Sequence, residues 1–258
     1  MSGVAVERFC AEVSASTATI ARLAGQRGLA CPVPTCPGWT LRELAVHVGR
    51  AHRWAAEIVR TRSAEPIPFR SVPDGKFPAE PGEQDRWLRA GAARLADTVQ
   101  AAGGDLVWTF AGQRPASFWA RRMAHETAVH RADAELAAGQ GPELDADLAA
   151  DGIDEWLGFL SGVFSPADGA DPRIEALPPG RSLHVHATDA PGAGEWTVRS
   201  EPSGITVERA HGKGDVAVRG PAARLLLVLV RRLPPADPAV EVIGDAAVLG
   251  RWLERTPF

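Results

Sequence analysis

The residues best suited to chemistry stand in the run HETAVH, residues 125–130. It places Glu126 four residues before His130, and side chains four apart lie on one face of a helix, so the two groups can converge. A carboxylate and an imidazole that converge are typical metal ligands. The pair therefore indicates either part of a metal site or two polar residues on a solvated helical face.

The neighbours of this pair indicate which face it occupies. One helical stripe, with spacings of 4, 3, 4 and 3 residues, is made by Trp119, Met123, Glu126, His130 and Asp133. The pair is therefore expected on the stripe that faces the core. A carboxylate buried there costs on the order of several kcal/mol unless it is paired or bound to a cation, so the pair requires a partner.

A helix earlier in the chain supplies that partner. Its stripe, with spacings of 3, 4, 3 and 4, consists of Leu44, His47, Ala51, Trp54 and Ile58. Two histidines and one glutamate from two helices form a three-ligand set with an open coordination position, as in catalytic zinc sites. We predict His47, Glu126 and His130 as these ligands. Spacing alone leaves open that each inward histidine is a hydrogen-bonded core residue.

The histidines adjacent to these positions are expected to point elsewhere. Because helical residues are rotated by about 100° each, His125 lies about 100° from Glu126 and His52 about 140° from His47. The two histidines of HETAVH are five residues apart, whereas zinc proteases use the HExxH spacing. A zinc protease is therefore excluded.

Other residues that can bind metal form no complete set in the sequence. Cys10, Cys31 and Cys36 are an odd number, which argues against a disulfide framework, and CPVPTC matches no redox or zinc-knuckle spacing. They are interpreted as structural or incidental thiols. His184 and His186 in SLHVHATD point to one face of a strand. Without an evident third ligand, a solvated strand face is the favoured interpretation over a metal site.

Helical periodicity predicts the elements that carry the stripes. The expected helices are one from residue 6 to a stop at Gly28, one from the Thr40 N-cap to about Arg62, one within 82–104, one with Pro115 as its first residue and a stop at Gly139, and one over about 144–160. Thr40 and Glu43 form a capping box, which fixes the start of the second helix.

Composition changes across SPADGADPRIEALPPG, residues 165–180, which is rich in Pro, Gly and Asp. Such a segment is typical of a connection. We predict a helical domain over 1–165, a linker over 166–180 and an α+β domain over 181–258. The last contains the alternating strands SLHVHAT, EWTVRSE, GITVER and DVAVRG, then the helix PAARLLLVLVRRL, the strand VEVIG and the helix DAAVLGRWLERT.

The overall composition excludes several classes of protein. The 258 residues are 45% hydrophobic and 23% charged, which is typical of a globular protein. The net charge is -4 and no Lys/Arg block occurs, so nucleic acid is not an expected partner. No stretch approaches the roughly 20 apolar residues that span a bilayer, and the acidic N-terminus does not match a signal peptide. We expect a cytoplasmic protein without a membrane partner.

Two N-terminal segments carry a resemblance to a known family, namely TCPGWTLRELAVHVGRAHRWA and WARRMAHETAVHRADAE. They resemble the metal-binding domain of the mycothiol-dependent maleylpyruvate isomerase family, a DinB-like four-helix bundle. DVAVRGPAARLLLVLVRRLP and VEVIGDAAVLGRWL are similar to the family's second domain, which is related to sterol-carrier folds. The resemblance implies a multidomain fold, with an all-α bundle followed by an α+β sterol-carrier-like domain.

The resemblance also implies a metal and a thiol. In the family, a histidine in W-T-x-x-x-L-x-x-H and the Glu and His of H-E-x-x-x-H bind a divalent metal, usually zinc; these match His47, Glu126 and His130. Mycothiol is the implied cosubstrate, and its metal-bound thiolate attacks an electrophilic small molecule. The outcome is either cis-trans isomerisation or a retained S-adduct, and the sequence does not choose between them.

An arginine for an acidic substrate is a further implication, because the guanidinium group matches carboxylates. Arg232, at the end of the LLLVLVRRL helix, is the expected catalytic residue, with Arg231 and Arg219 as neighbouring choices. Arg122 is expected to contact the bound cofactor or substrate, or to pair with Asp133.

Two other functions stay open from the sequence. One is a non-catalytic metal- or ligand-binding or regulatory module that keeps the fold without the chemistry. The other is a lipid carrier that acts through the C-terminal domain, which rests on fold analogy alone. The expected assembly is a monomer or a homodimer, with a small-molecule electrophile and a low-molecular-weight thiol as partners.

Overall fold

The structure of the chain is a computed structural model that describes residues 5–163, 176–190, 192, 194–202, 204–256 and 258. It forms two compact units, Met1–Glu143 and Leu144–Phe258. Most of the predicted linker at 166–180 lies outside the described residues. The boundary between the units lies before the fifth predicted helix. The prediction had assigned that helix to the helical domain because it precedes the linker.

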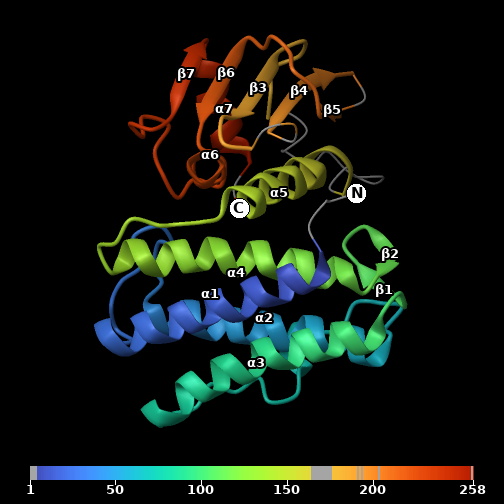
Figure 1. Cartoon of the computed structure of the whole chain (residues 1–258), viewed down its shortest axis with the longest axis vertical. Coiled ribbons are helices and arrows are strands. Elements are labelled where there is room, and N and C mark those ends of the chain that lie inside the picture. Colours follow the sequence, from blue (N-terminus) through green and yellow to red (C-terminus); the bar gives the residue numbers. More distant parts are fainter. Residues whose placement is uncertain (1–4, 164–175, 191, 193, 203, 257) are drawn as a thin grey trace. The chain divides into compact units, whose positions relative to one another are not determined.

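The described part of the first unit is built on four long helices, α1 (Val6–Arg27), α2 (Leu41–Thr61), α3 (Pro81–Ala102) and α4 (Ser117–Ala137), with a short 3-10 turn, η1, at Phe69–Ser71. α1 and α2 each pack against both α3 and α4, and Figure 1 shows the helices side by side. The bounds of α1, α2 and α3 agree with the predicted periodicity. No helix among the described residues combines the length and the apolar character that a bilayer crossing requires.

The start of α2 is fixed by its cap. The Thr40 amide donates to Glu43 Oε2 at 3.0 Å, and Thr40 Oγ1 accepts from the Arg42 amide at 3.2 Å, which confirms the predicted capping box. The Leu41 amide donates to the Cys31 carbonyl at 2.8 Å, so the proline-rich loop closes against the same helix end. His47 thereby has a defined position seven residues after the cap.

The segment between α3 and α4 was predicted as a short link but folds into a hairpin. Antiparallel strands β1 (Leu106–Thr109) and β2 (Gly112–Pro115) pair from end to end. Pro115 therefore ends a strand, and the prediction that it opens a helix is wrong, since α4 begins two residues later. The Trp119 indole N–H donates to the Trp108 carbonyl at 2.9 Å and ties the hairpin to α4. β2 is exposed throughout, so its sequence shows no alternation of apolar and polar residues that would indicate a strand.

The second unit has a five-stranded sheet with the order β5-β4-β3-β6-β7 in its described residues. β3 and β6 are parallel, and the other neighbouring strands are antiparallel. The elements are α5 (Ala146–Gly158), the π-helical turn η2 (Phe159–Val163), β3 (Ser182–Ala187), β4 (Glu195–Glu201), β5 (Gly204–Glu208), β6 (Val216–Gly220), α6 (Ala222–Leu229), β7 (Glu241–Gly244) and α7 (Ala246–Arg255). α5 packs against α6, which is why it belongs to this unit.

α6 is shorter than its apolar sequence predicts. It ends at Leu229, and Arg231 takes a left-handed conformation with φ of 62°. The amides of Arg232 and Leu233 both donate to the Leu227 carbonyl, at 2.7 and 3.1 Å. Arg232 therefore lies in a turn beyond the helix, which corrects its predicted place at the helix end.

The two faces of the sheet differ in character. On β3, Leu183 and Val185 are fully buried and lie opposite apolar residues of β4. α6 and α7 pack against the sheet through β3 and β6. Because side chains alternate along a strand, His184 and His186 share the opposite face, as predicted. The prediction of a solvated strand face is wrong for His184, which is only 5% exposed.

The closeness of α2 and α3 depends on Gly49. A Cβ atom at this position would lie 2.1 Å from the Trp87 ring, so Gly49→Ala is expected to lower the free energy of unfolding by about 1–3 kcal/mol through overpacking. Urea denaturation followed by circular dichroism measures this change. The matched control is Gly25→Ala on α1, where a Cβ meets nothing within 4 Å and helix propensity should add up to about 1 kcal/mol. Equal stability of Gly49→Ala and wild type would contradict the contact.

Candidate metal centre

α2 and α4 pack together and bring three side chains to one point. The potential ligand atoms of His47, Glu126 and His130 all lie within 4.8 Å of one another. His47 Nε2 is 2.9 Å from Glu126 Oε1, and the ring centroids of His47 and His130 are 4.9 Å apart. The structure thus brings together the three residues that spacing placed on inward stripes.

Glu126 is held as a carboxylate. Its Oε1 faces His47, and its Oε2 accepts a hydrogen bond from Arg122 Nη2 at 3.0 Å. Burial favours a raised pKa for Glu126, but the hydrogen bond with His47 and the charge of Arg122 outweigh it, and the pKa lies well below its usual value. Glu126 is therefore an anion at neutral pH, the form that binds cations. The sequence predicted that Arg122 contacts a ligand or pairs with Asp133, and did not predict its hydrogen bond with Glu126.

His130 is oriented by the fully buried Asp133. Asp133 Oδ2 is 2.9 Å from His130 Nδ1, and the same carboxylate accepts from Thr35 Oγ1 at 2.5 Å and from the Cys36 thiol at 3.4 Å. When Nδ1 carries the proton, Nε2 presents the lone pair that a metal requires. A carboxylate behind a ligating histidine is a recurrent support in metal sites. Asp133 stood on the predicted stripe, but this role was not predicted.

Trp39 packs against both imidazoles. Its ring centroid lies 5.2 Å from that of His47 and 6.0 Å from that of His130, and it stacks on the second at an interplanar angle of 25°. It comes from the proline-rich loop, whose Val33 amide donates to the Trp39 carbonyl at 2.9 Å. Sequence reasoning missed this contact, although an aromatic residue directly before the Thr40 cap was the available signal.

The donor set fits a divalent metal. Two imidazole nitrogens and one carboxylate oxygen are the protein ligands of many catalytic zinc sites, where donors about 2.0–2.2 Å from the ion lie about 3.3–3.5 Å apart. The 2.9 Å between His47 Nε2 and Glu126 Oε1 needs only a small widening. The side chains of His47 and Glu126 are 32% and 22% exposed, against 6% for His130, so a small molecule can reach the first two.

An overlapping set consists of Cys36, His130 and Asp133, whose ligand atoms also lie within 4.8 Å. In this set His130 Nδ1 and Asp133 already satisfy one another through their hydrogen bond. A metal bound by His47, Glu126 and His130 Nε2 leaves that bond intact. We therefore interpret Cys36 and Asp133 as support for the centre.

The two histidines predicted to point away do so. His52 Nε2 lies 2.8 Å from Thr127 Oγ1 in the core, and His125 makes an edge contact with Phe9 at 5.7 Å between ring centroids. Burial, with a contribution from the charge of Arg53, lowers the pKa of His52 to about 3. His52 is thus a neutral core histidine at physiological pH.

The predicted substrate arginine lies in the second unit. Arg232 Nη1 donates to the Val230 carbonyl at 2.9 Å, and its guanidinium carbon lies 5.1 Å from the centre of the Phe258 ring. The neighbouring choices differ: Arg231 is exposed, and Arg219 pairs with Glu241 at 3.6 Å. A half-buried guanidinium with a defined orientation distinguishes Arg232 from both.

Family comparison finds two matches that together cover most of the chain. Residues 9–135 match the mycothiol maleylpyruvate isomerase N-terminal domain, and residues 147–251 match the MDMPI C-terminal domain. The chain belongs to the mycothiol maleylpyruvate isomerase family. The two matches leave a gap around the division between the structural units, and the second includes α5.

Solved structures of similar fold include crystal structures of the mycothiol-dependent maleylpyruvate isomerase. One aligns with this family member at a TM-score of 0.59 and 16% sequence identity, covering 93% of both chains. A mutant of the same isomerase aligns at 0.59 and 15% identity, again over 93% of both chains. At this identity the likeness concerns the fold, a helical unit followed by one that combines helices and a sheet. No curated protein sequence matches the chain.

The support by Asp133 is testable through metal affinity. Asp133→Asn removes the charge that orients His130, so zinc binding is expected to weaken about 10–100-fold. Competition with a chromophoric chelator measures the zinc affinity. The relevant binding step is the one that is absent in Glu126→Ala. Asp97→Asn, at an exposed position on α3, is the matched control. Unchanged affinity in Asp133→Asn would show that the carboxylate only stabilises the fold.

The buried neutral His52 predicts a pH dependence of stability. Its pKa is about 3 in the folded chain and about 6.5 when unfolded, so below about pH 6.5 the unfolded state binds the additional proton. Stability is therefore lost as the pH falls from 6.5, with a slope that approaches about 1.4 kcal/mol per pH unit. Denaturant unfolding in EDTA between pH 5 and 7 should show this slope reduced in His52→Gln. Asp97→Asn, at an exposed position on α3, should keep it, and a slope unchanged in both variants would assign it to other groups.

Proposed function

We propose that the protein is a metal-dependent and mycothiol-dependent enzyme of the maleylpyruvate isomerase type, acting on an electrophilic small molecule as a cis-trans isomerase or a thiol S-transferase. Zinc, or another divalent metal, is held by His47, Glu126 and His130. The observation that carries the proposal is the convergence of these side chains from α2 and α4 with Asp133 directly behind His130.

The chain's own residues prepare the centre for a thiol. A divalent metal supplies one property, a lower pKa of the coordinated thiol, which keeps it as thiolate near neutral pH. Glu126 contributes a negative charge that His47 and Arg122 stabilise. Asp133 directs His130, and the Trp39 ring excludes water from one side of both imidazoles. The partly exposed His47 and Glu126 form the side on which the thiol enters.

Two arginines are proposed to act on the reactants. Arg232 binds the carboxylate of an acidic substrate, for which the planar guanidinium is suited. Arg122 contacts the bound thiol cofactor while it holds Glu126 in place through their ion pair. A rigid, charged group four residues before Glu126 is well suited to position an anionic or polar ligand.

The finer assignment of the fold belongs to the same proposal. The helical unit is proposed to be a DinB-like four-helix bundle, and the second unit an α+β domain of the sterol-carrier type. Within this proposal the enzyme works in the cytoplasm as a monomer or a homodimer, with neither nucleic acid nor membrane as a partner.

Metal content tests the ligand set. Relative to wild type, Glu126→Ala/His130→Ala is expected to lose one equivalent of zinc per chain after reconstitution, because two of three ligands are gone. Elemental analysis of the untagged protein measures this. Glu80→Ala/Glu83→Ala, at exposed carboxylates near the start of α3, controls for a general loss of charge. Full zinc content in Glu126→Ala/His130→Ala would refute the site.

Turnover tests the chemistry separately. The metal-loaded protein should accelerate the reaction of mycothiol with monobromobimane, or the isomerisation of maleylpyruvate, well above the uncatalysed rate. Arg232→Lys should raise KM for an acidic substrate and leave the reaction of an uncharged electrophile unchanged. Zinc binding without acceleration of either reaction would contradict the enzyme and favour a metal-binding module.

A further inference from the structure

The polar face of the sheet gathers four side chains that the metal centre in the first unit does not use. In the register of β3 and β4, His186 lies directly opposite Glu195, and His184 lies two residues along the same face. The ligand atoms of His184, His186 and Glu195 lie within 4.8 Å of one another. The third ligand that the sequence did not reveal is therefore Glu195, on the neighbouring strand.

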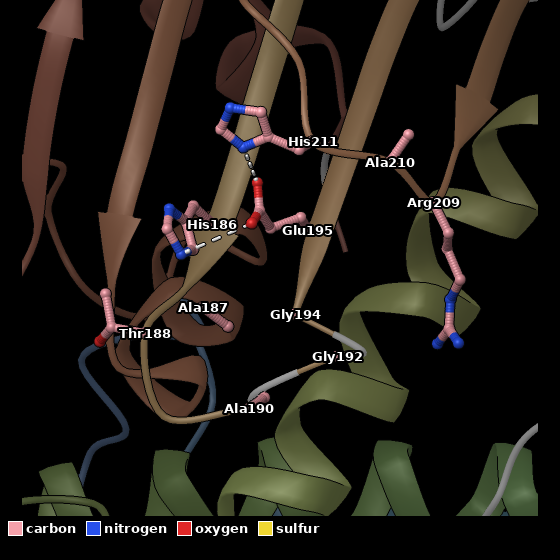
Figure 2. A pocket seen from close by; sticks show the side chains of 10 residues that line it. All are labelled: His186, Ala187, Thr188, Ala190, Gly192, Gly194, Glu195, Arg209, Ala210 and His211. Atoms are coloured by element: carbon pink, nitrogen blue, oxygen red, sulfur yellow. Dashed lines mark hydrogen bonds and ion pairs between the residues drawn. The ribbon is translucent and has the colours of Figure 1, made fainter.

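His211 completes the group from the loop after β5. Its Nδ1 lies 2.7 Å from Glu195 Oε2, and Figure 2 shows His186 and His211 pointing toward this carboxylate from two sides. Two glycines let the loop lie close to the sheet: a Cβ at Gly212 would be 2.6 Å from Thr197 Oγ1, and one at Gly214 would be 2.9 Å from the His184 amide nitrogen. The loop backbone is thus shaped to hold His211 against Glu195.

His184 Nε2 faces the Glu195 carboxylate. Its Nδ1 lies 3.5 Å from Thr197 Oγ1, which donates to the Ala210 carbonyl at 3.2 Å. The buried Nε2 lies 3.1 Å from Glu195 Oε2. One ion can therefore reach both atoms.

We propose that His184, His186 and Glu195 form a second metal site, which binds a divalent transition-metal ion such as Zn²⁺, and that His211 positions Glu195. Donors about 2.0–2.2 Å from a tetrahedral ion lie about 3.3–3.5 Å apart. The separations to the Glu195 oxygens, 3.1 Å from His184 Nε2 and 3.9 Å from His186 Nε2, lie on either side of this value. Two imidazoles and one carboxylate select such an ion over Mg²⁺ or Ca²⁺.

The site opens into a cavity of about 380 Å³ whose lining includes His186, Glu195, Arg209 and His211. The Arg209 side chain points away from Glu195 in Figure 2, and its Nε bonds Asp154 at 2.6 Å, so it does not compete for the carboxylate. Three protein ligands beside an open space leave a coordination position for water or a small ligand.

Zinc binding by the full chain tests the proposal without depending on the proposed function. In the Glu126→Ala/His130→Ala background, equilibrium dialysis with Zn²⁺ should still find one bound equivalent per chain, and Co²⁺ should give a visible absorption band at the same stoichiometry. Adding His186→Ala/Glu195→Gln should remove the equivalent or weaken it by about a hundredfold or more. His211→Ala should weaken it by about 10–100-fold, as for other groups that orient a ligand.

Controls separate site loss from unfolding. Glu201→Gln, at an exposed residue on the far end of β4, should keep the equivalent, and far-UV circular dichroism with thermal unfolding in EDTA should show every variant folded. The proposal is overturned if the folded background variant binds no Zn²⁺, or if His186→Ala/Glu195→Gln binds it as tightly as the background does. A failure of the proposed function gives a different result: Glu126→Ala/His130→Ala would then bind as much zinc per chain as wild type does.

Discussion

An ionised carboxylate inside a helical unit sets the main constraint on the first half of the chain. Glu126 cannot stay charged between α2 and α4 without nearby compensation, and both His47 and Arg122 supply it. The helix pairing and the cap of α2 place His47 beside Glu126, and the buried Asp133 orients His130 next to them. The same balance yields an anionic donor beside two imidazoles, so the stability of the fold and the chemistry of the site have a common origin.

Much of the helical unit follows from local rules that a sequence displays. The periodicity of the stripes and the Thr40–Glu43 capping box fix where α2 begins and which side chains it turns inward. The same rules do not predict the β1–β2 hairpin, because its strands have only four residues each and β2 is exposed throughout. These local rules do not predict the end of α6 either, because nothing in the apolar run LLLVLV indicates that Arg231 takes a left-handed conformation.

The second unit shows a different limit of prediction. The alternation of β3 places His184 and His186 on one face from sequence alone, but their partner Glu195 depends on the register of β3 with β4 and His211 on the path of a loop. Register is a long-range property, set by packing on the opposite face of the sheet. The placement of α5 is also a long-range property: the prediction assigned it to the helical domain, whereas its packing on α6 places it in the second unit.

The cap of α2 has a consequence for how the segment between Thr40 and His47 can vary among relatives. Since each helical residue turns the chain by about 100°, one inserted or deleted residue after the cap would carry His47 off the face that meets Glu126. Substitutions at its outward positions, such as the exposed Arg42, leave that angle unchanged. The length of this segment is therefore under stricter constraint than its composition. Relatives that bind a metal here should show no insertion or deletion between the cap and the histidine, even where the other residues differ.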